Sequence, residues 1–373
     1  MKKIKSNILL SPGPANTTYT VKCAQVVPDI CPREKEFGDL MDYVSRSLTE
    51  LVADNQKYTT ILFSGSGTAA VEAMLSSVVN KTEKLMIINN GAYGQRMCEI
   101  AGVYGLDYLE FKSSSVEALD LLAIEKTIKN NTSIKWLAVV HNETTSGLLN
   151  DISSLGEICK NNDITMLVDA VSSYAAIPIN MFEMNISYLA ASSNKNIQGM
   201  AGVSFVIAEI KEIEKLKNKK INNYYLNLYE QYNYFVKNHQ MRFTPPVQTL
   251  YALKQAIEEA KQETIEKRYK RYSKSWQTLV AGLEDLGLKY LIKKEFHSKI
   301  VTSIVEPDCQ KYNFIKMHDF LKEKGFTIYP GKVSNLNTFR IANIGDIDYR
   351  DIEDFLVVLK DYLKDIGLLI KIV

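Results

Sequence analysis

The sequence predicts an α/β protein with a doubly wound, mainly parallel sheet and a smaller C-terminal α/β domain. Short apolar strands alternate with helical patterns over residues 58–208, and this alternation is typical of a parallel sheet covered by helices on both faces. From about residue 289 the pattern changes to a few strands and two helices, which indicates a second unit. We therefore expect a large domain over residues 15–265 and a small domain over residues 266–373 together with residues 1–14.

The composition is that of an ordinary globular protein. Hydrophobic residues make up 46% and charged residues 24% of the chain, and 45 Lys and Arg against 43 Asp and Glu leave a net charge of +2. This balance gives no reason to expect a nucleic-acid partner. The five scattered cysteines form no CxxC pair, so neither a disulfide framework nor a metal site is expected. Apolar runs are too short for a membrane span or a signal peptide, so we expect a cytoplasmic protein with no membrane partner.

The N-terminal part predicts a short strand followed by one amphipathic helix. Residues 8–10 form an apolar run that the SPGP turn at 11–14 ends sharply. Apolar side chains then recur at spacings of 3, 1, 3, 4, 3 and 1 between Phe37 and Val52. This spacing places them on one face of a helix, which we expect over residues 36–52.

The turn SGSGT at 64–68 lies between a predicted strand over residues 58–63 and a predicted helix. At such a helix start, backbone N–H groups point outward, the helix dipole adds partial positive charge, and Ser66 and Thr68 offer hydroxyls. This arrangement suits a phosphate group. No lysine follows the second glycine, so the turn is not a Walker loop. A purely structural turn of small residues is the alternative interpretation.

A carboxylate and a lysine follow two further predicted strands. Asp169 ends the strand at 166–168, and Lys195 comes shortly after the strand at 188–191. In pyridoxal phosphate (PLP) chemistry, a lysine amine makes a Schiff base with the cofactor aldehyde. An aspartate pairs with the pyridinium nitrogen and keeps it protonated, so that the ring acts as an electron sink. For either residue alone, a strand-capping aspartate or a surface lysine is the simpler interpretation.

Candidate residues recur at the ends of the predicted strands. Tyr93 follows the strand at 84–89 within a predicted turn, and Thr145 follows the strand at 136–141. An aromatic ring at the first position could stack on a flat cofactor, with a plain turn tyrosine as the alternative. Because ligands collect at the carboxyl ends of parallel strands, we expect these residues to lie with Asp169 and Lys195 at one edge of the sheet.

The C-terminal third predicts a connecting helix and the small domain. Pro245 and Pro246 open a long helix with Thr244 as its N-cap, and the helix is expected to run to about residue 286. The small domain is predicted as strands at 298–305, 327–329 and around residue 340, a turn at 330–333, and helices at 312–324 and 349–366. Arg340 alternates with apolar neighbours on its strand, so it faces the opposite side. A substrate carboxylate or a structural acidic residue could be its partner.

Motifs along nearly the whole chain, over residues 8–366, resemble the 2-aminoethylphosphonate–pyruvate transaminases. These are class-V members of the fold-type I PLP enzymes. In chain order the motifs are SPGP, ICPREKEFG, SGSGTAAVEAML, NGAYGQRM, HNETTSG, VDAVSS, SSNKNIQG, RFTPPV, YPGK and TFRIANIGD. The resemblance implies a fold-type I PLP transferase: a large PLP-binding domain with a mainly parallel, seven-stranded type of sheet flanked by helices, plus a smaller C-terminal domain. It also implies a homodimer with two active sites at the interface.

The resemblance implies roles for the residues that face the reaction. Lys195 resembles the Schiff-base lysine, and Asp169 resembles the partner of the pyridinium nitrogen. Tyr93 is similar to the aromatic residue that stacks on the cofactor ring. Thr145 resembles the hydroxyl near the ring oxygen, and Arg340 resembles the arginine that holds the substrate carboxylate.

The resemblance also implies a cup for the cofactor phosphate. Ser66, Gly67 and Thr68 are similar to the residues of this cup, to which Asn194 could contribute. Thr244 resembles a residue that the other subunit supplies to the phosphate.

The activity that the resemblance implies is the exchange of an amino group between 2-aminoethylphosphonate and pyruvate, giving phosphonoacetaldehyde and L-alanine. An alanine–glyoxylate or serine–glyoxylate type of class-V aminotransferase is the alternative within the fold. A regulator that binds a phosphate at the SGSGT turn without catalysis is the alternative from another class.

Overall fold

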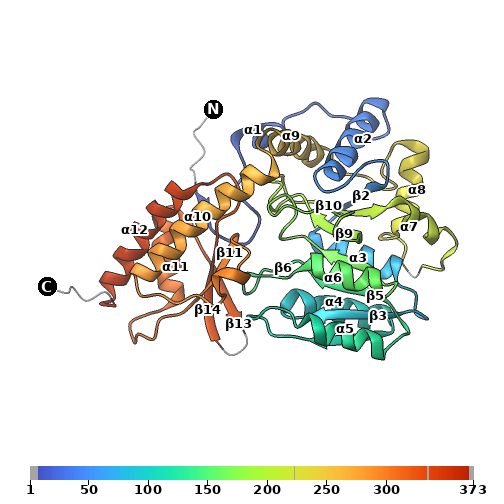
Figure 1. Cartoon of the computed structure of the whole chain (residues 1–373). Helices are drawn as coiled ribbons and strands as arrows, with labels where there is room; N and C mark the ends of the chain where they lie inside the picture. The colour runs from blue at the N-terminus through green and yellow to red at the C-terminus, as the bar shows by residue number, and fades with distance from the viewer. Residues whose placement is uncertain (1–6, 222, 334–335, 369–373) are drawn as a thin grey trace.

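The computed structural model describes residues 7–221, 223–333 and 336–368. A seven-stranded sheet with helices on both sides lies at the right of Figure 1, and a three-stranded sheet with its own helices lies at the left. Over these residues, no helix combines the length and the apolar character needed to cross a membrane.

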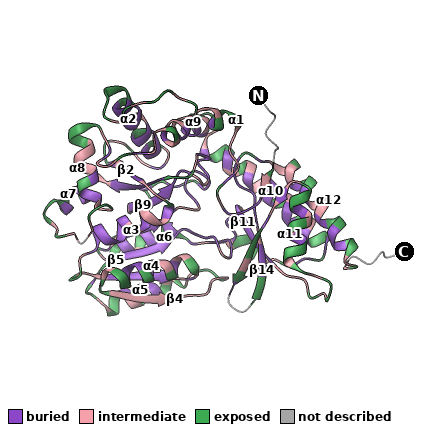
Figure 2. Ribbon diagram, turned by 180° about the vertical axis from the view of Figure 1, so that it is seen from behind, coloured by how far each residue is buried: buried purple, intermediate pink, exposed green. Residues whose placement is uncertain are grey.

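The large sheet is mainly parallel, as the sequence predicts. Its strand order is β2-β10-β9-β8-β5-β3-β4, and only β10 runs antiparallel to its neighbours. The central strands are buried on both faces, which is why they read as continuous apolar runs (Figure 2). The strands are β2 (Tyr58–Ser64), β3 (Lys84–Asn89), β4 (Tyr108–Lys112), β5 (Ile134–Val140), β8 (Thr165–Asp169), β9 (Ile186–Ser192) and β10 (Val203–Glu209).

Helices cover the two faces of this sheet through two separate apolar clusters. The face that contains Leu137 and Val168 is covered by α2 (Lys35–Glu50), α5 (Leu121–Asn130), α6 (Ile152–Asn161) and α9 (Val247–Glu263). The face that contains Ala138 and Leu167 is covered by α3 (Gly67–Val78), α4 (Ala92–Tyr104), α7 (Ile210–Glu214) and the start of α8 (Leu228–Asn238).

The small sheet is antiparallel, with the order β11-β14-β13. Its strands are β11 (Val301–Val305), β13 (Tyr329–Val333) and β14 (Leu336–Ala342), and it packs against α10 (Ile265–Asp285), α11 (Phe314–Glu323) and α12 (Tyr349–Asp365). The N-terminal strand β1 (Ile8–Leu9) pairs with β12 (Phe326–Thr327) of this part. The remaining short elements are α1 (Tyr19–Cys23), β6 (Asn142–Glu143), β7 (Leu148–Leu149) and two 3-10 helices, η1 (Lys215–Asn218) and η2 (Lys294–Phe296).

The prediction of one long helix after the two prolines is wrong. The chain forms α9 and α10 instead, separated at Thr264, whose φ of +66° breaks the helix and whose side chain accepts from the N–H of Lys267. Both halves keep an apolar face, so the periodicity does not reveal the break. The N-cap position of α9 is Pro246, and Thr244 lies outside the helix.

Three local predictions are also wrong. Tyr93 lies in the first turn of α4 because the helix begins at Ala92, two residues after the strand-end asparagines. The residues 330–333 belong to strand β13, where they pair with β14, and do not form a turn. The sequence predicts a helix over residues 116–129, but helix α5 starts only at Leu121, because Asp120 caps it by accepting from the N–H of Ala123 at 2.9 Å.

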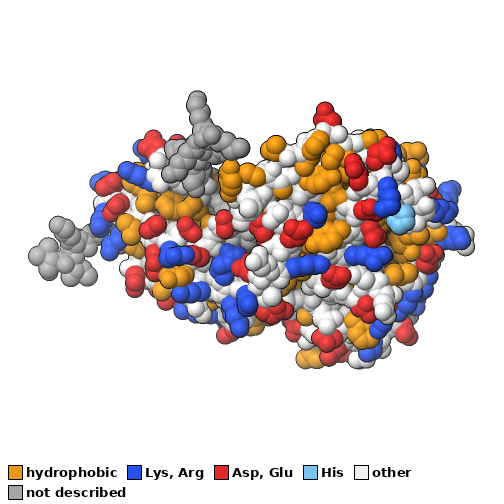
Figure 3. Space-filling view, turned by 90° about the horizontal axis from the view of Figure 1, so that it is seen from above, with side chains coloured by type: hydrophobic (Ala, Val, Ile, Leu, Met, Phe, Trp, Pro, Cys, Tyr) orange, Lys and Arg blue, Asp and Glu red, His pale blue; other side chains and the backbone are white. Residues whose placement is uncertain are grey.

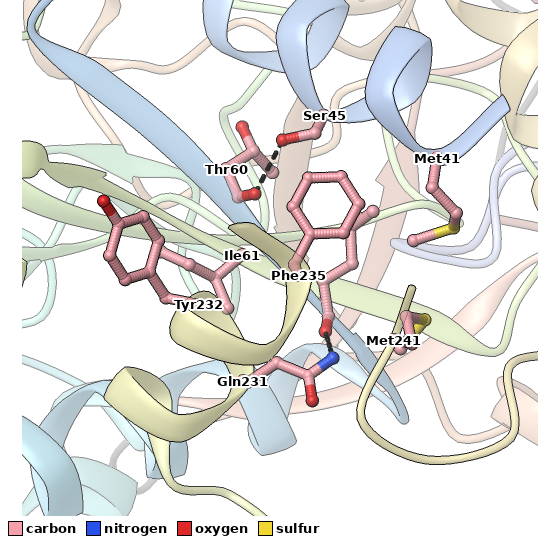
Figure 4. A pocket seen from close by; sticks show the side chains of 9 residues that line it. Met41, Ser45, Thr60, Ile61, Gln231, Tyr232, Phe235 and Met241 are labelled. Carbon is pink, nitrogen blue, oxygen red and sulfur yellow. Dashed lines mark hydrogen bonds between the residues drawn. The ribbon is translucent and has the colours of Figure 1, made fainter. Parts of the chain in front are cut away.

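Polar side chains fasten two helices to the edge strand β2. A cavity of about 10 Å³ lies there. Ser45 donates to the carbonyl oxygen of Thr60 at 2.8 Å, and Gln231 donates to that of Leu62 at 2.9 Å; Figure 4 shows Ser45, Thr60 and Gln231 around this cavity. This volume holds about one water molecule. The cavity is therefore a packing feature and cannot hold an organic ligand.

Candidate active site

One cavity of about 500 Å³ lies at the carboxyl ends of strands β2, β3, β8 and β9. Ligands bind at this edge in open parallel sheets because the strand ends and the following loops leave a crevice there. The cavity brings together most of the residues that the sequence singles out. Those on its wall are Ser66, Gly67, Thr68, Tyr93, Asp169, Asn194 and Lys195.

A wider cleft of about 640 Å³ lies elsewhere, beside the end of α2. It is lined by Lys57, whose amine lies 4.1 Å from the ring centroid of Phe182, and by scattered acidic residues. None of the residues that the motifs single out lies on its wall. Its size therefore does not make it the better candidate.

The start of α3 forms a cup for an anion. Ser66 occupies the N-cap position and lines the cavity. Its side chain makes no capping hydrogen bond, so its hydroxyl can bind a ligand. Thr68 accepts a hydrogen bond from Nη1 of Arg96 at 3.4 Å. A Cβ on Gly67 would lie 2.6 Å from Cγ1 of Val171, so only glycine fits here. The cup thus combines hydroxyls, free helix N–H groups and a guanidinium, all of which favour an anion.

Lys195 lies in a loop that follows β9, residues 193–199, which we name the lysine loop. Its amine donates a hydrogen bond to the carbonyl oxygen of Pro12. Gly13 has a φ of +143°, which L side chains rarely adopt, so the N-terminal segment passes over the lysine at a glycine. The pKa of Lys195 is lowered to about 8, chiefly by burial and to a smaller extent by Arg340 and Arg96, while Asp169 acts in the other direction. A neutral amine is therefore accessible near neutral pH.

Asp169 ends β8 and is buried, with 5% of its surface exposed. Its Oδ1 accepts from the N–H of Val171 at 2.9 Å. Burial raises the pKa of Asp169 to about 6, and the nearby carboxylate of Glu143 adds to this, whereas Arg96 and Lys195 act in the other direction. A buried carboxylate of this kind gains stability when a cation is placed beside it.

Glu143 is a buried carboxyl group that the sequence reasoning missed. It accepts from the hydroxyl of Thr145 at 2.5 Å, from the N–H of Thr145 at 3.1 Å and from the N–H of Tyr93 at 3.2 Å. Burial raises its pKa. Through these bonds Glu143 ties the loop after β5 to the start of α4. Thr145 itself does not line the cavity and contributes only through its hydrogen bonds to Glu143.

Arg96 is the second residue that the sequence reasoning missed. It lies on the cavity wall, and its guanidinium carbon is 4.7 Å from the ring centroid of Tyr93. The signal for it was present in the motif NGAYGQRM, because residues three positions apart share a helix face. The predicted turn at 91–94 hid this relationship.

Besides Thr145, two further predicted site residues lie outside the cavity wall. Thr244 is exposed, and its carbonyl oxygen accepts from the hydroxyl of Ser64 at 3.4 Å. Arg340 lies on β14 of the small sheet, donates to the carbonyl oxygen of Pro330 at 3.0 and 3.3 Å, and has its guanidinium carbon 4.8 Å from the ring centroid of Tyr329. It is close enough to the cavity to contribute to the lowered pKa of Lys195, of which burial is the largest cause.

Comparisons with known proteins show the family to which this chain belongs. The profile of the family "Aminotransferase class-V" matches residues 15–344. A 2-aminoethylphosphonate–pyruvate transaminase of Salmonella paratyphi B is 38% identical over 359 residues, covering 95% of this chain and 97% of the relative. The chain belongs to this transaminase family of class-V aminotransferases.

Further relatives place the family member in context. A bifunctional phosphonoacetaldehyde hydrolase/aminoethylphosphonate transaminase of Clostridioides difficile is 37% identical over 96% of this chain, which spans 56% of that longer protein. The crystal structure of an alanine–glyoxylate aminotransferase from Nostoc sp. superposes with a TM-score of 0.90 at 26% identity, covering 97% of this chain and 96% of that chain. The fold is therefore that of the fold-type I PLP aminotransferases.

The family implies PLP as the cofactor, and the residues of the cavity fit it. A volume of about 500 Å³ lies within the usual range for ligand sites. The cup at Ser66 and Thr68 can hold a phosphate, together with Arg96. Asp169 can hold a protonated ring nitrogen, and Lys195 supplies the amine that the aldehyde requires. The cavity thus offers groups that suit the phosphate, the ring nitrogen and the aldehyde of the cofactor.

Proposed function

We propose that this class-V aminotransferase moves the amino group of 2-aminoethylphosphonate to pyruvate, giving phosphonoacetaldehyde and L-alanine. The observation that carries the proposal is the 38% identity to a transaminase of that name over nearly the full length of both chains. The glyoxylate type of aminotransferase shares the fold at 26% identity, so it is the weaker candidate.

Lys195 and Asp169 are the proposed catalytic residues. PLP supplies an aldehyde that captures amines and a ring that withdraws electrons from the substrate carbon. Asp169 would hold the proton on the ring nitrogen, because within the described residues its buried carboxylate accepts from the N–H of Val171 and forms no ion pair. The amine of Lys195 would take the proton from the substrate carbon that carries the amino group and would pass it to the cofactor. Its lowered pKa suits both directions of this transfer.

Two arginines are the proposed anchors for anions. The Arg340 guanidinium binds the phosphonate of one substrate and the carboxylate of the other. Within the described residues it forms no ion pair, donates to the carbonyl oxygen of Pro330 and lies over the Tyr329 ring. A planar guanidinium can meet either anion with two parallel hydrogen bonds. Arg96 adds positive charge beside the phosphate cup. Tyr93 stacks on the ring, and Asn194 completes the polar wall. Thr145 acts from outside the wall through its hydrogen bond to Glu143.

The assembly is also a proposal. We infer a homodimer in the cytoplasm, in which the exposed Thr244 reaches the phosphate cup of the partner subunit. Aromatic groups of Tyr225 and Phe243 stack beside Thr244 with ring centroids 5.1 Å apart, and Tyr224 is 72% exposed in the same region. Such a patch is suited to contact with another chain.

We further infer a PLP-binding domain at 15–265 and a small domain at 266–373 with 1–14. Within these ranges, residues 1–6, 222, 334–335 and 369–373 lie outside the described part.

The charge on the surface fits small-molecule substrates. On the face seen in Figure 3, acidic and basic side chains are interspersed, and the chain carries a net charge of +2. A basic stripe, which nucleic-acid binding requires, is not seen on that face. We therefore propose that 2-aminoethylphosphonate and pyruvate are the ligands.

The deciding experiment is a half-reaction without any keto acid. The purified, PLP-loaded protein is mixed with 2-aminoethylphosphonate, with serine or with alanine, and the visible absorbance of the cofactor is followed. We expect loss of the absorbance with 2-aminoethylphosphonate and with alanine, the donor of the reverse reaction, and release of phosphonoacetaldehyde in the first case. Rapid change with serine and none with 2-aminoethylphosphonate would move the protein to the glyoxylate type. A Lys195→Ala variant is the control that binds PLP without turnover.

A further inference from the structure

Tyr272 of α10 joins two segments that follow different sheets. Its hydroxyl oxygen accepts a hydrogen bond from Nε2 of Gln198 at 2.9 Å and another from the backbone N–H of Gly345 at 2.8 Å. Gln198 is in the lysine loop, shortly after Lys195, and Gly345 follows the strand that carries Arg340. Tyr272 is fully buried, so water cannot replace either bond.

A partly buried cluster of three charged residues makes a second connection between the same two segments. Glu263 binds Nε of Arg268 and Nε of Arg271, each at 2.7 Å. Arg268, which is 1% exposed, donates to the carbonyl oxygen of Asn196 in the lysine loop at 2.6 Å. Arg271 donates to the carbonyl oxygen of Gly345 at 2.8 Å. Two independent routes through the start of α10 thus fasten the lysine loop to the segment after β14.

Both segments have backbones that need this support. Gln198 has a φ of +64°, which L-residues rarely adopt, and its N–H donates to the carbonyl oxygen of Lys195 at 2.9 Å. Gly345 has a φ of +97°, and a Cβ there would lie 2.4 Å from the nitrogen of Asn16. If the hydroxyl of Tyr272 were lost, the amide of Gln198 and the N–H of Gly345 would both be left without an acceptor.

We propose that Tyr272 is a positioning residue, whose hydroxyl holds the lysine loop in register with the segment that follows Arg340. The proposal rests on the proposed function, which gives Lys195 and Arg340 their roles toward one substrate. A substrate held at two points requires both groups at a fixed separation, because a small misplacement of a reacting group costs much of the rate. The single hydroxyl of Tyr272 touches both segments directly, so it sets this separation.

The test uses Tyr272→Phe, which keeps the ring and removes only the hydroxyl. The matched control is Tyr362→Phe. Tyr362 is also buried and donates to the carbonyl oxygen of Asn313 at 3.2 Å, but it lies on α12 away from the cavity. Removal of Glu263 or Arg268 is a poorer test, since it leaves a buried charge without its partner.

The first measurement is made on the protein without PLP. A limiting amount of an acylating reagent is added over a range of pH, and the acylation of Lys195 is quantified by peptide mass spectrometry against the exposed Lys35. The amine of Lys195 should titrate near pH 8 in the unchanged protein. In Tyr272→Phe the loosened loop lets water reach the amine, so the midpoint should move upward. In Tyr362→Phe it should not move.

The second measurement compares turnover in the PLP-loaded protein. We expect kcat/KM for the amino donor to fall roughly 10- to 100-fold in Tyr272→Phe, the scale of a misplaced reacting group, and to stay within about twofold in the control. Gln198→Asn shortens the amide so that it no longer reaches the hydroxyl, while asparagine tolerates the left-handed backbone. The kcat/KM of the double variant should be no lower than that of Tyr272→Phe alone, because Tyr272→Phe has already removed the bond between Gln198 and Tyr272.

The outcomes separate the two proposals. If Tyr272→Phe loses thermal stability like the control but leaves both the Lys195 midpoint and kcat/KM unchanged, the positioning role is overturned. If Tyr272→Phe does not fold, Gln198→Asn breaks the same bond from the other side and must show the same shifts. If the unchanged protein fails to use 2-aminoethylphosphonate while the midpoint still shifts in Tyr272→Phe, the proposed function fails and the positioning of the lysine loop stands.

Discussion

Asp169 and Lys195 lie on the wall of one cavity, and each stabilises the charged form of the other. After burial, Lys195 lowers the pKa of Asp169 and Asp169 raises the pKa of Lys195. Burial acts in the opposite direction on both groups and is stronger. The result is a carboxyl group and an amine that both titrate closer to neutrality than they would in water, where Asp has a pKa near 3.9 and Lys near 10.4.

Lys195 should be reactive at unusually low pH in the protein without PLP. Because its folded pKa is lowered to about 8, acylation at Lys195 should rise with a midpoint near pH 8. In Asp169→Asn the midpoint should fall further, since the opposing charge is gone. Mass spectrometry of the acylated peptides measures both. A midpoint near that of the surface lysines would contradict the burial of this amine.

The same shift predicts a dependence of stability on pH. Between about pH 8 and pH 10.5, the unfolded chain holds more protons at Lys195 than the folded chain does. This group therefore makes the free energy of unfolding rise with pH across that window. Lys195→Met should abolish the rise, which chemical denaturation at pH 7.5 and pH 10 can measure on the protein without PLP.

Asp169→Asn should lower the turnover and raise the stability of the protein at pH 7. The amide cannot hold a protonated ring nitrogen, so turnover should fall by roughly 10²- to 10⁴-fold, the usual scale of such contributions. In the protein without PLP, the folded pKa of about 6 lies above the ordinary 3.8, so ionised Asp169 lowers stability above pH 6. The variant should be more stable at pH 7, by about 1–3 kcal/mol, and no different at pH 3.5. Near-normal turnover would rule out the proposed role.

Arg340→Lys should weaken the binding of pyruvate and leave the cofactor spectrum intact. A lysine keeps the charge but cannot form the paired hydrogen bonds of a guanidinium. We expect KM for pyruvate to rise by about tenfold or more, with a smaller change in kcat. The absorbance of bound PLP is the internal control, because Arg340 does not line the cavity that fits the cofactor. An unchanged KM would remove Arg340 from the substrate site.

Thr244 should act across the subunit interface, and mixed dimers can show it. Thr244→Ala should retain PLP poorly, and Lys195→Ala should be inactive. A dimer with one subunit of each kind has one site that combines an intact Lys195 with an intact Thr244 only if Thr244 comes from the partner. Activity in the mixture above the sum of the two variants is therefore expected. A fully active monomer in sedimentation would contradict the proposal.

Local sequence determined much of the fold and of the candidate site. Apolar runs fix the strands of the large sheet, because a strand buried on both faces must be apolar throughout. The residues just beyond those strands, such as Asp169 and Lys195, then had to meet at one edge of a parallel sheet. Ser66 and Thr68 could be placed in the same way, because a turn between a strand and a helix puts N–H groups and hydroxyls together.

Only the tertiary structure decided what surrounds those residues. Two hydrogen bonds join segments that are far apart in the chain. The amine of Lys195 donates to the carbonyl oxygen of Pro12, and Arg268 donates to a carbonyl oxygen of the lysine loop. In the sequence, Glu143 is one polar residue among several after a strand. In the structure it is buried and accepts from both Thr145 and the N–H of Tyr93 at the start of α4. The break at Thr264 is set by one residue with positive φ. Periodicity records which face is apolar, whereas these features depend on distances between segments that the local pattern does not contain.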